Sequence, residues 1–558
     1  MSQDYLVAGV DFGTDSVRVG VWDLARRECV LTLSQPFERW AAGEFCQPER
    51  QQFRQHPLDH LEALDRLFAD VAAELGEGAI SALAIDSTGS TPAPTDRHGV
   101  PLALLPGHEN DPDCMFWLWK DHTSSTAADE VNSALAAGEV DFTTYQGEYS
   151  SEWWWAKILH GVRTSGAIRE HARSWVEHSD WITNLLVGAH DAHAFVRNAC
   201  AAGHKVLFNR RLGGMVPGST LAGLDPHLAE VARTFRTPPA PAGTPVGTLT
   251  PQWAERLRLS TSTVVAVGSL DAHAGAVGAG IGPGTLVKVV GTSTVDMFLT
   301  DYASIEGRDT RAFSGVAEDS ILPGWLGGEA GQAAFGDLFA WYARVLASPW
   351  EEIWRDQLTG RLPADEVEVM LAASRDRLLP TLEREALARG SSGIVALDWI
   401  NGRRYPNLDD RASAALVNLR IGHDAADLYR SLVHAAVLGS KAIFAGLSEA
   451  GARIERVLLI GGVVRNSPMI CQALADGLGT DVMVSTATEV CATGSAMYAA
   501  VAIGAFSSIA EAQAALAEPY RADFSPSATG RAEFDRGLVD YARVGALIGS
   551  LRLTPAMD

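Results

Sequence analysis

The stretch Leu6–Asp23, LVAGVDFGTDSVRVGVWD, decides the fold of this chain. An apolar run ends at Asp11, and beyond a short polar corner Val17, Val19 and Val21 alternate with other residues. Alternation with a period of two on both sides of a corner rich in glycine and hydroxyl residues predicts a strand, a turn and a second strand.

The corner between these strands has the composition of a phosphate-binding site. Gly13 lets the backbone approach an anion closely, and Thr14 and Ser16 offer hydroxyl and amide donors. Asp11 offers a carboxylate for a hydrated Mg²⁺ ion. On this motif alone, a plain hairpin turn is an equally good interpretation.

A second copy of the pattern occurs at Thr285–Thr300, TLVKVVGTSTVDMFLT. The five residues from Gly13 align with the five from Gly291, half a chain length later. A repeat at this spacing favours an internal duplication, in which two lobes each present a glycine–threonine corner to one nucleotide.

Composition and charge limit the kinds of partner. The 558 residues are 47% hydrophobic and 20% charged, which is typical of a soluble globular protein. The net charge of −23 argues against nucleic acid or an anionic membrane as a partner, because both attract basic surfaces. The six cysteines have no close pairs, which argues against a disulfide or zinc framework. No signal peptide or membrane-spanning run is recognisable, so we expect a cytoplasmic protein.

Two further strands are predicted to end in polar residues in the first half of the chain. Ile80–Ile85 runs into a serine, threonine and glycine patch at residues 86–91, and the carboxyl ends of strands are where α/β proteins bind ligands. Thr263–Val267 is followed by Asp271 and a helix of small residues over Ala274–Ile281. A catalytic carboxylate at Asp271 fits this position, and so does a simple helix cap.

Other candidate positions are less specific. Gly461 and Gly462 follow a predicted strand, and a glycine pair there lets a flat ring lie on bare backbone. Lys205 suits a hydroxyl-rich ligand but equally suits an ordinary surface. Histidines of the preceding segment, His204 included, form no closed ligand set and are expected to be solvated. The P-loop, HExxH, GxSxG and GxGxxG motifs of competing chemistries are missing from the sequence.

Taken in order, the motifs resemble the FGGY carbohydrate kinases of the actin/hexokinase/Hsp70 superfamily. The stretches that carry the resemblance are DFGTDS, GSLDAHAGAVGAG, VKVVGTST, GGEAGQAAFGD, LDWINGRR and LLIGGVVRNS, and they run from about residue 5 to residue 506. Within the family, YSSEWWWAKI, AAGHK and WKDHT are similar to the ribulokinase branch. Gly89-Ser90 stands where xylulokinase-like relatives carry Met-His, which disfavours xylulose as the substrate.

The resemblance implies an α/β fold of two ribonuclease-H-like lobes around a central cleft. Residues 1–270 would form the lobe that binds most of the sugar and carries the first phosphate hairpin. Residues 271–558 would form the lobe that binds most of the ATP.

The resemblance also implies roles for single residues. Asp271 would be the general base, with Lys205 and Glu329 holding the sugar hydroxyls beside it. The other residues expected to line the sugar pocket are Ala93, Trp119 and Asp121. Asp11 would bind Mg²⁺. The residues expected to bind ATP are Gly13, Thr14, Ser16, Gly291 and Thr292 at the phosphates, and Gly461, Gly462 and Asn466 at the adenosine.

The activity implied is ATP-dependent phosphorylation of L-ribulose at the 5-hydroxyl. Another pentulose or pentitol, such as D-ribulose or ribitol, is the alternative substrate. A nucleotide-switched binding protein is a rival of another class, disfavoured because no peptide-binding domain is appended. The sequence leaves a homodimer open.

Overall fold

The predicted hairpin at the start of the chain is the centre of a six-stranded sheet. The computed structural model describes residues 5–409 and 411–551. β1 (Leu6–Phe12) pairs antiparallel with β2 (Ser16–Asp23), so that Val10 faces Val19. The sheet runs in the order β10-β11-β6-β1-β2-β3 and adds β3 (Glu28–Pro36), β6 (Ile80–Ser87), β10 (Pro245–Thr248) and β11 (Val264–Leu270). β1, β6 and β11 are parallel to one another.

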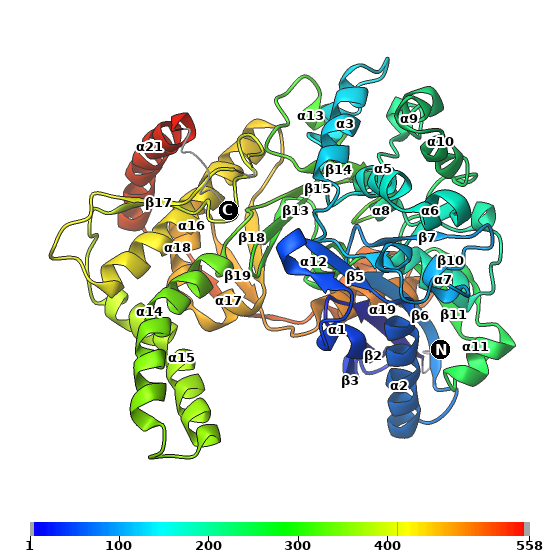
Figure 1. Cartoon of the computed structure of the whole chain (residues 1–558), viewed down its shortest axis with the longest axis horizontal. Helices are drawn as coiled ribbons and strands as arrows, with labels where there is room; N and C mark the ends of the chain where they lie inside the picture. Colours follow the sequence, from blue (N-terminus) through cyan, green and yellow to red (C-terminus); the bar gives the residue numbers. More distant parts are fainter. Residues whose placement is uncertain (1–4, 410, 552–558) are drawn as a thin grey trace.

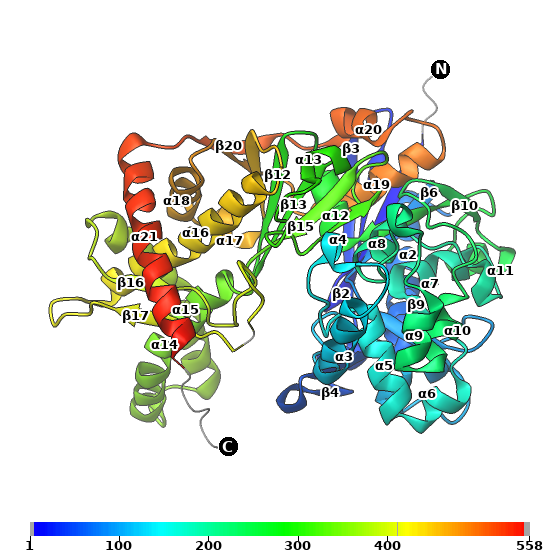
Figure 2. The same cartoon turned by 90° about the horizontal axis from the view of Figure 1, so that it is seen from above.

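The second predicted hairpin is the centre of a seven-stranded sheet in the other lobe (Figures 1 and 2). β12 (Thr285–Val290) and β13 (Thr294–Thr300) form that hairpin. The order is β14-β15-β13-β12-β18-β19-β20, with β14 (Gly315–Glu318), β15 (Leu326–Ala330), β18 (Arg456–Ile460), β19 (Val482–Ser485) and β20 (Tyr520–Phe524). The five strands β15-β13-β12-β18-β19 repeat the order and directions of β3-β2-β1-β6-β11. The predicted repeat of the hairpin, and the two α/β lobes, are confirmed.

Two helices join the lobes. α12 (Asp271–Gly278) follows β11 directly, and α19 (Val490–Ala502) packs on α12 and on β1. The contact with β1 is close, because a Cβ atom built on Gly9 would lie 1.7 Å from the carbonyl oxygen of Ala492. The helix predicted over Ala274–Ile281 corresponds to α12. It begins three residues earlier than predicted, so Asp271 lies in its first turn. A late segment of the chain thus lies directly on the sheet formed by residues 6–270.

Helices cover the outer faces of both sheets and extend beyond them. In the first lobe the principal helices are α2 (Pro57–Leu75), α3 (Ser125–Ala136), α5 (Trp154–Thr164), α7 (His178–Leu186) and α8 (Ala199–His204). In the second lobe they are α14 (Gly336–Leu358), α15 (Ala364–Leu387), α16 (Ala425–Glu449), α18 (Pro468–Leu478) and α21 (Ala528–Ser550). α14 and α15 project from the second lobe as a pair (Figure 1). The tryptophans Trp117, Trp154 and Trp155 are fully buried core residues.

One helix of the described chain, α16, is long and apolar enough to cross a membrane by length and composition alone. Most of its apolar window is buried inside the second lobe, where Val433, Ala436 and Val437 belong to the hydrophobic core. α16 is therefore a core helix of this fold.

Candidate active site

Three carboxylates lie at the ends of three neighbouring parallel strands. Asp11 in β1 is in register with Asp86 in β6, and Asp271 follows the last residue of β11. Burial raises the pKa of Asp11 and, together with the charge of Asp11, raises the pKa of Asp86 well above its usual value. Ser495 of α19 donates a hydrogen bond of 2.6 Å to Asp86. The sequence patch at 86–91 contained Asp86 but gave no reason to single it out.

Asp271 is partly buried at the start of α12. Its Oδ1 atom accepts a hydrogen bond of 2.7 Å from the backbone amide of Ala272, which leaves Oδ2 free for another partner. Burial, and then the negative charge of Asp11, raise the pKa of Asp271 to about 7. A carboxylate with this pKa exchanges a proton readily near neutral pH, as a general base must.

Lys205 and Glu329 meet from opposite lobes. Lys205 lies at the end of α8, and its Nζ atom donates to Glu329 of β15 at 3.1 Å. His273 of α12 lies 3.1 Å from the same carboxylate, and both Lys205 and His273 act on the pKa of Asp271. Although burial opposes it, the nearby cations hold the pKa of Glu329 well below its usual range. Four predicted residues, Asp11, Asp271, Lys205 and Glu329, are therefore brought together.

Two histidines beside Glu329 were missed. His204 is buried on α8, 3.9 Å from Glu329, so the expectation of a solvated histidine is wrong. Burial lowers the pKa of His204 to about 3. Burial opposes ionisation of His273 too, but Cys200 and Glu329 raise the pKa of His273 to about 10. The motif GSLDAHAG contains His273, but only the register of α12 against β15 shows that it faces Glu329.

Ala93 and Asp121, two of the residues expected to line the sugar pocket, are both buried in this structure. Ala93 is fully buried in β7 (Pro92–Thr95), where it pairs with Val176 of β9 (Ser174–Glu177) and packs in the core. Asp121 is also fully buried, and its carboxylate accepts from the amide of Phe53 at 2.7 Å and contacts Arg54. The contact of these two residues with the sugar stays a prediction.

The neighbouring residues of the expected sugar wall are more open. Trp119 is partly exposed, and its indole donates to Thr14 Oγ1 of the first corner at 3.2 Å. Gly89 is the partly exposed residue at the end of β6, and a Cβ atom built there would lie 2.1 Å from a methyl group of Leu270. The sequence noted Gly89 only as a departure from xylulokinase-like relatives.

Both hairpin corners offer unpaired backbone amides. Within the described residues, the amides of Thr14, Asp15, Thr292 and Ser293 donate to no protein acceptor. Amides directed outward from a turn make an anion-binding concavity. The corners are thus suited to the oxygens of a polyphosphate.

The glycine pair lies against the second corner. Gly461 has a φ of 118°, and a Cβ atom there would lie 2.2 Å from the carbonyl oxygen of Val290. Gly462 has open space where a side chain would be, and Asn466 is exposed at the end of α17 (Gly462–Asn466). The structure therefore places Gly291, Gly461 and Gly462 at one edge of the second sheet, with bare backbone available to a ligand.

Comparison with known proteins agrees with this geometry. The sequence model of the C-terminal domain of the FGGY family of carbohydrate kinases matches residues 286–503. A ribulokinase from Vibrio parahaemolyticus is 37% identical over 93% of this chain and 92% of its own length. The chain belongs to the FGGY family of carbohydrate kinases. A ribulokinase from Shouchella clausii is 33% identical over 89% of this chain and 86% of its own length.

Solved FGGY kinases share the fold over nearly the whole chain. A xylulose kinase from Rhodospirillum rubrum superimposes with a TM-score of 0.73 at 20% identity, covering 98% of this chain and 99% of that one. A Plasmodium falciparum glycerol kinase with ADP gives a TM-score of 0.74 at 14% identity, with the same coverage. Kinases of this family use ATP, and the free amides and bare glycines described above fit its phosphates and its flat base.

The donor atoms near the first corner also fit a divalent cation. Ligand atoms of Asp11, Asp86 and Cys491 all lie within 4.8 Å of one another. Carboxylate oxygens are the ligands that Mg²⁺ prefers, although a thiol is not. Asp11 and Asp86 are therefore the residues that would hold Mg²⁺, directly or through water.

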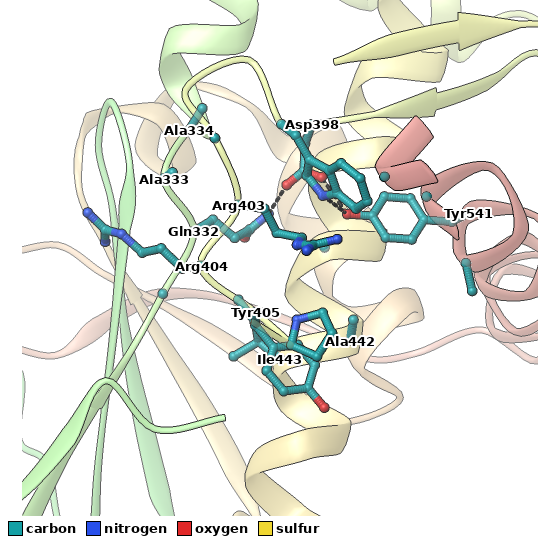
Figure 3. Close-up of a pocket in the computed structure, with 18 of the residues that line it drawn as sticks. Gln332, Ala333, Ala334, Asp398, Arg403, Arg404, Tyr405, Ala442, Ile443 and Tyr541 are labelled. Atoms are coloured by element: carbon teal, nitrogen blue, oxygen red, sulfur yellow. Dashed lines mark hydrogen bonds between the residues drawn. The ribbon is translucent and has the colours of Figure 1, made fainter. Parts of the chain in front are cut away.

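A cavity of about 420 Å³ lies in the second lobe, between α16, α21 and the loops at 331–334 and 398–406 (Figure 3). Asp398 accepts hydrogen bonds from Tyr541 at 2.6 Å and from Gln332 at 2.7 Å on its wall. None of the predicted site residues lines this cavity. Its loop at 331–334 adjoins the second corner, because the amide of Thr294 donates to the carbonyl oxygen of Gln332 at 3.1 Å.

Proposed function

We propose that this FGGY kinase transfers the γ-phosphoryl group of ATP to the 5-hydroxyl of L-ribulose. The observation that carries the proposal is the meeting of Asp271, Lys205 and Glu329 beside the acidic ends of β1 and β6. The choice of L-ribulose is supported by relatives named ribulokinase that are 30–37% identical over most of the chain.

Each residue has a definite part in the proposed reaction. Lys205 donates hydrogen bonds to sugar oxygens and Glu329 accepts them from sugar hydroxyls, which orients the 5-hydroxyl toward Asp271. Asp271 receives the hydroxyl proton on Oδ2, the oxygen that Ala272 leaves free. When bound, ATP and Mg²⁺ supply the phosphoryl group and neutralise its charge.

The remaining residues stabilise charge and exclude water. The amides of Thr14 and Thr292 donate to phosphoryl oxygens from the two sides. Phosphoryl transfer depends mainly on positioning and electrostatic stabilisation. The two lobes contribute to catalysis by holding the sugar and the nucleotide next to each other. Residues 1–270 would supply most sugar contacts and residues 271–558 most nucleotide contacts. Asp271 and Glu329 are the exceptions, since both belong to residues 271–558 and act on the sugar.

A coupled assay of ADP release tests the proposal. L-Ribulose, D-ribulose, ribitol, D-xylulose and glycerol are compared under identical conditions, and the position of the phosphate in the product is determined by ³¹P NMR. We expect the highest kcat/KM with L-ribulose and phosphate on its 5-oxygen. A higher kcat/KM with another polyol would reassign the substrate, and ADP release that no sugar stimulates would favour a nucleotide-switched binding protein.

A further inference from the structure

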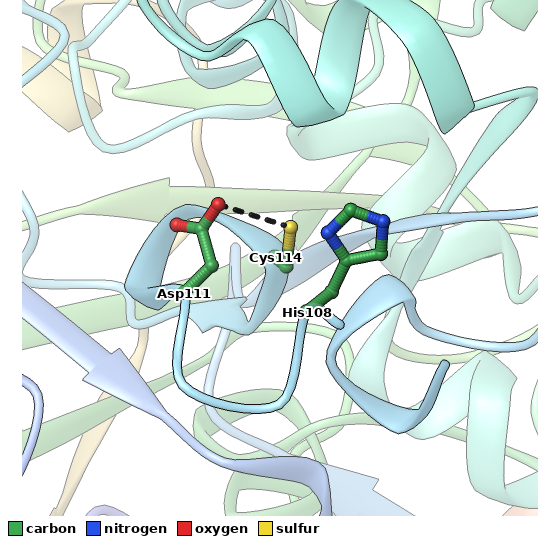
Figure 4. Close-up of side chains that lie close together, drawn as sticks. All are labelled: His108, Asp111 and Cys114. Carbon is green, nitrogen blue, oxygen red and sulfur yellow. Dashed lines mark hydrogen bonds between the residues drawn. The ribbon is translucent and has the colours of Figure 1, made fainter. Parts of the chain in front are cut away.

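A group of three metal-ligating side chains lies outside the candidate active site, on the loop that leads into β8 (Phe116–Trp117). His108, Asp111 and Cys114 direct their side chains toward one another, with the sulfur between the carboxylate and the imidazole (Figure 4). One ligand atom from each lies within 4.8 Å of the other two. Cys114 Sγ donates to Asp111 Oδ2 at 3.6 Å.

We propose that His108, Asp111 and Cys114 form a zinc-binding site. A thiolate, an imidazole and a carboxylate are the three ligand types that Zn²⁺ takes in proteins. Tetrahedral zinc holds its ligand atoms roughly 3.3–3.8 Å apart, as follows from its bond lengths. Cys114 Sγ and Asp111 Oδ2, 3.6 Å apart, are already in that range, and the side chain of His108 is half-buried beside them.

A fourth ligand is close at hand. The ring of His171, at the end of α6 (Gly166–His171), lies with its centroid 4.9 Å from that of His108. Its side chain is 44% exposed, so it is free to rotate toward the same point. Zinc sites of the structural kind are closed by four protein ligands, and this neighbourhood provides four.

The backbone already holds the ligands in place. Asp111 caps the short helix η3 (Pro112–Cys114), with its Oδ1 accepting from the amide of Asp113 at 3.0 Å. The amide of Asp111 donates to the carbonyl oxygen of His108 at 3.1 Å. The three ligands are three positions apart in the sequence, and the turn places all of them on one side. The site contains a single cysteine, so the absence of close cysteine pairs in the sequence does not exclude it.

The other two clusters of this kind in the described part of the chain already have a place. His204, His273 and Glu329 lie at the proposed sugar site next to Lys205, and Asp11, Asp86 and Cys491 lie at the first corner. Only the His108 cluster belongs neither to the proposed sugar site nor to the first corner. The zinc ion would have a structural role, because it would join the loop before β8 to the end of α6. Binding would release the thiol proton to solvent.

The braced segment leads to the first corner. β8 pairs with β5 (Gln52–Gln55), and Gln55 of β5 donates to the carbonyl oxygen of Thr14 at 2.7 Å. Zinc bound at the loop would therefore stabilise the strand that supports this corner. A ligand that binds only the folded state raises stability by mass action.

The experiment uses the full chain after removal of metals with a chelator. Zn²⁺ stoichiometry is measured by elemental analysis, and Cd²⁺ is added as a probe whose bond to a thiolate gives an ultraviolet charge-transfer band. We expect one strongly bound zinc per chain, a cadmium–thiolate band, and a rise in Tm on adding zinc. Cys114→Ser and His108→Gln should lose all three, and His171→Ala should weaken zinc binding about tenfold or more.

Two matched variants keep the result decisive. Cys46→Ser removes a partly buried thiol of the same lobe and should leave the band and the Tm shift intact. Cys491→Ser tests the nucleotide site. A band that survives in Cys114→Ser, or one lost only in Cys491→Ser, would overturn the proposal. Because neither readout requires turnover, failure here is distinguishable from failure of the proposed kinase activity.

Discussion

The two lobes have the same central strands but opposite chemistry at the strand ends. Asp11 in β1 is in register with Asp86 in β6, whereas the corresponding pair of the second lobe is Val289 in β12 and Ile460 in β18. β11 leads into Asp271, but its counterpart β19 ends at Ser485. All three carboxylates at these positions lie at the ends of strands of the first sheet.

This difference shows how a duplicated scaffold divides one reaction. Backbone amides at Thr14 and Thr292 are equivalent, since the turn alone determines them. Side chains are under no such constraint. In the proposed reaction the acids at the ends of β1, β6 and β11 handle a proton and a cation, and the bare backbone at Gly461 and Gly462 accepts the nucleotide. The predictions below test whether catalysis is as unequal between the lobes as the charges are.

Replacing Asp271 by Asn should have the largest effect. The amide keeps the size of the carboxyl group but cannot accept the hydroxyl proton, so kcat should fall by ~10²–10⁴-fold. Steady-state ADP release measures kcat, and calorimetric titration with ADP measures nucleotide binding, which should be largely unchanged. Near-normal turnover would show that another group is the base.

Matched substitutions at the two corners should have unequal effects. Asp11→Asn should lower kcat by about 10–100-fold and raise the Mg²⁺ concentration needed for half-maximal rate, because a ligand of the cation, direct or through water, is weakened. Val289→Thr changes the equivalent position of the other corner and should leave both quantities nearly unchanged. Magnesium titrations of the two variants make the comparison, and equal losses would mean that the lobes share the cation.

The pH dependence should follow Asp271. Since burial and Asp11 raise its pKa to about 7, the carboxyl is protonated at lower pH and is then unable to act as a base. The value of kcat/KM for the sugar should therefore fall about tenfold per pH unit below that pKa and level off above it. Asp11→Asn removes a negative neighbour and should move the break to lower pH, whereas Val289→Thr should not. A flat profile between pH 5.5 and 8 would contradict this assignment.

Most of the fold was predictable because local patterns of apolar and polar residues determine its strands and turns. The alternation around Gly13 and Gly291 determines both hairpins, and their repetition predicts the two lobes. A strand, Arg456–Ile460, directly precedes Gly461 as predicted, and the carboxylate of Asp271 directly follows a strand as expected. The predicted start of α12 was wrong because β11 runs directly into the helix, so no turn residues mark the boundary between them.

The site was less predictable wherever it depends on contacts between distant segments. Asp86 matters because β6 pairs in register with β1, and His273 matters because it lies 3.1 Å from Glu329 of β15 in the second sheet. Neither contact leaves a trace in spacing along the chain. Ala93 and Asp121 are buried, and their contact with the sugar stays a prediction.

The smallest effect is expected at Ala93, and it tests whether this buried residue contacts the sugar. Ala93→Ser adds one hydroxyl to a fully buried position of β7 that packs in the core. The free energy of unfolding should fall by about 1–3 kcal/mol, since the new polar group is buried without an assured partner. The KM for the sugar should change less than about twofold, within the range of an uninvolved position. Denaturant unfolding and initial-rate kinetics on the same preparation separate the two quantities. A tenfold change in KM with unaltered stability would instead place Ala93 against the sugar, and would mean that the first lobe rearranges between β7 and β9 when the substrate binds.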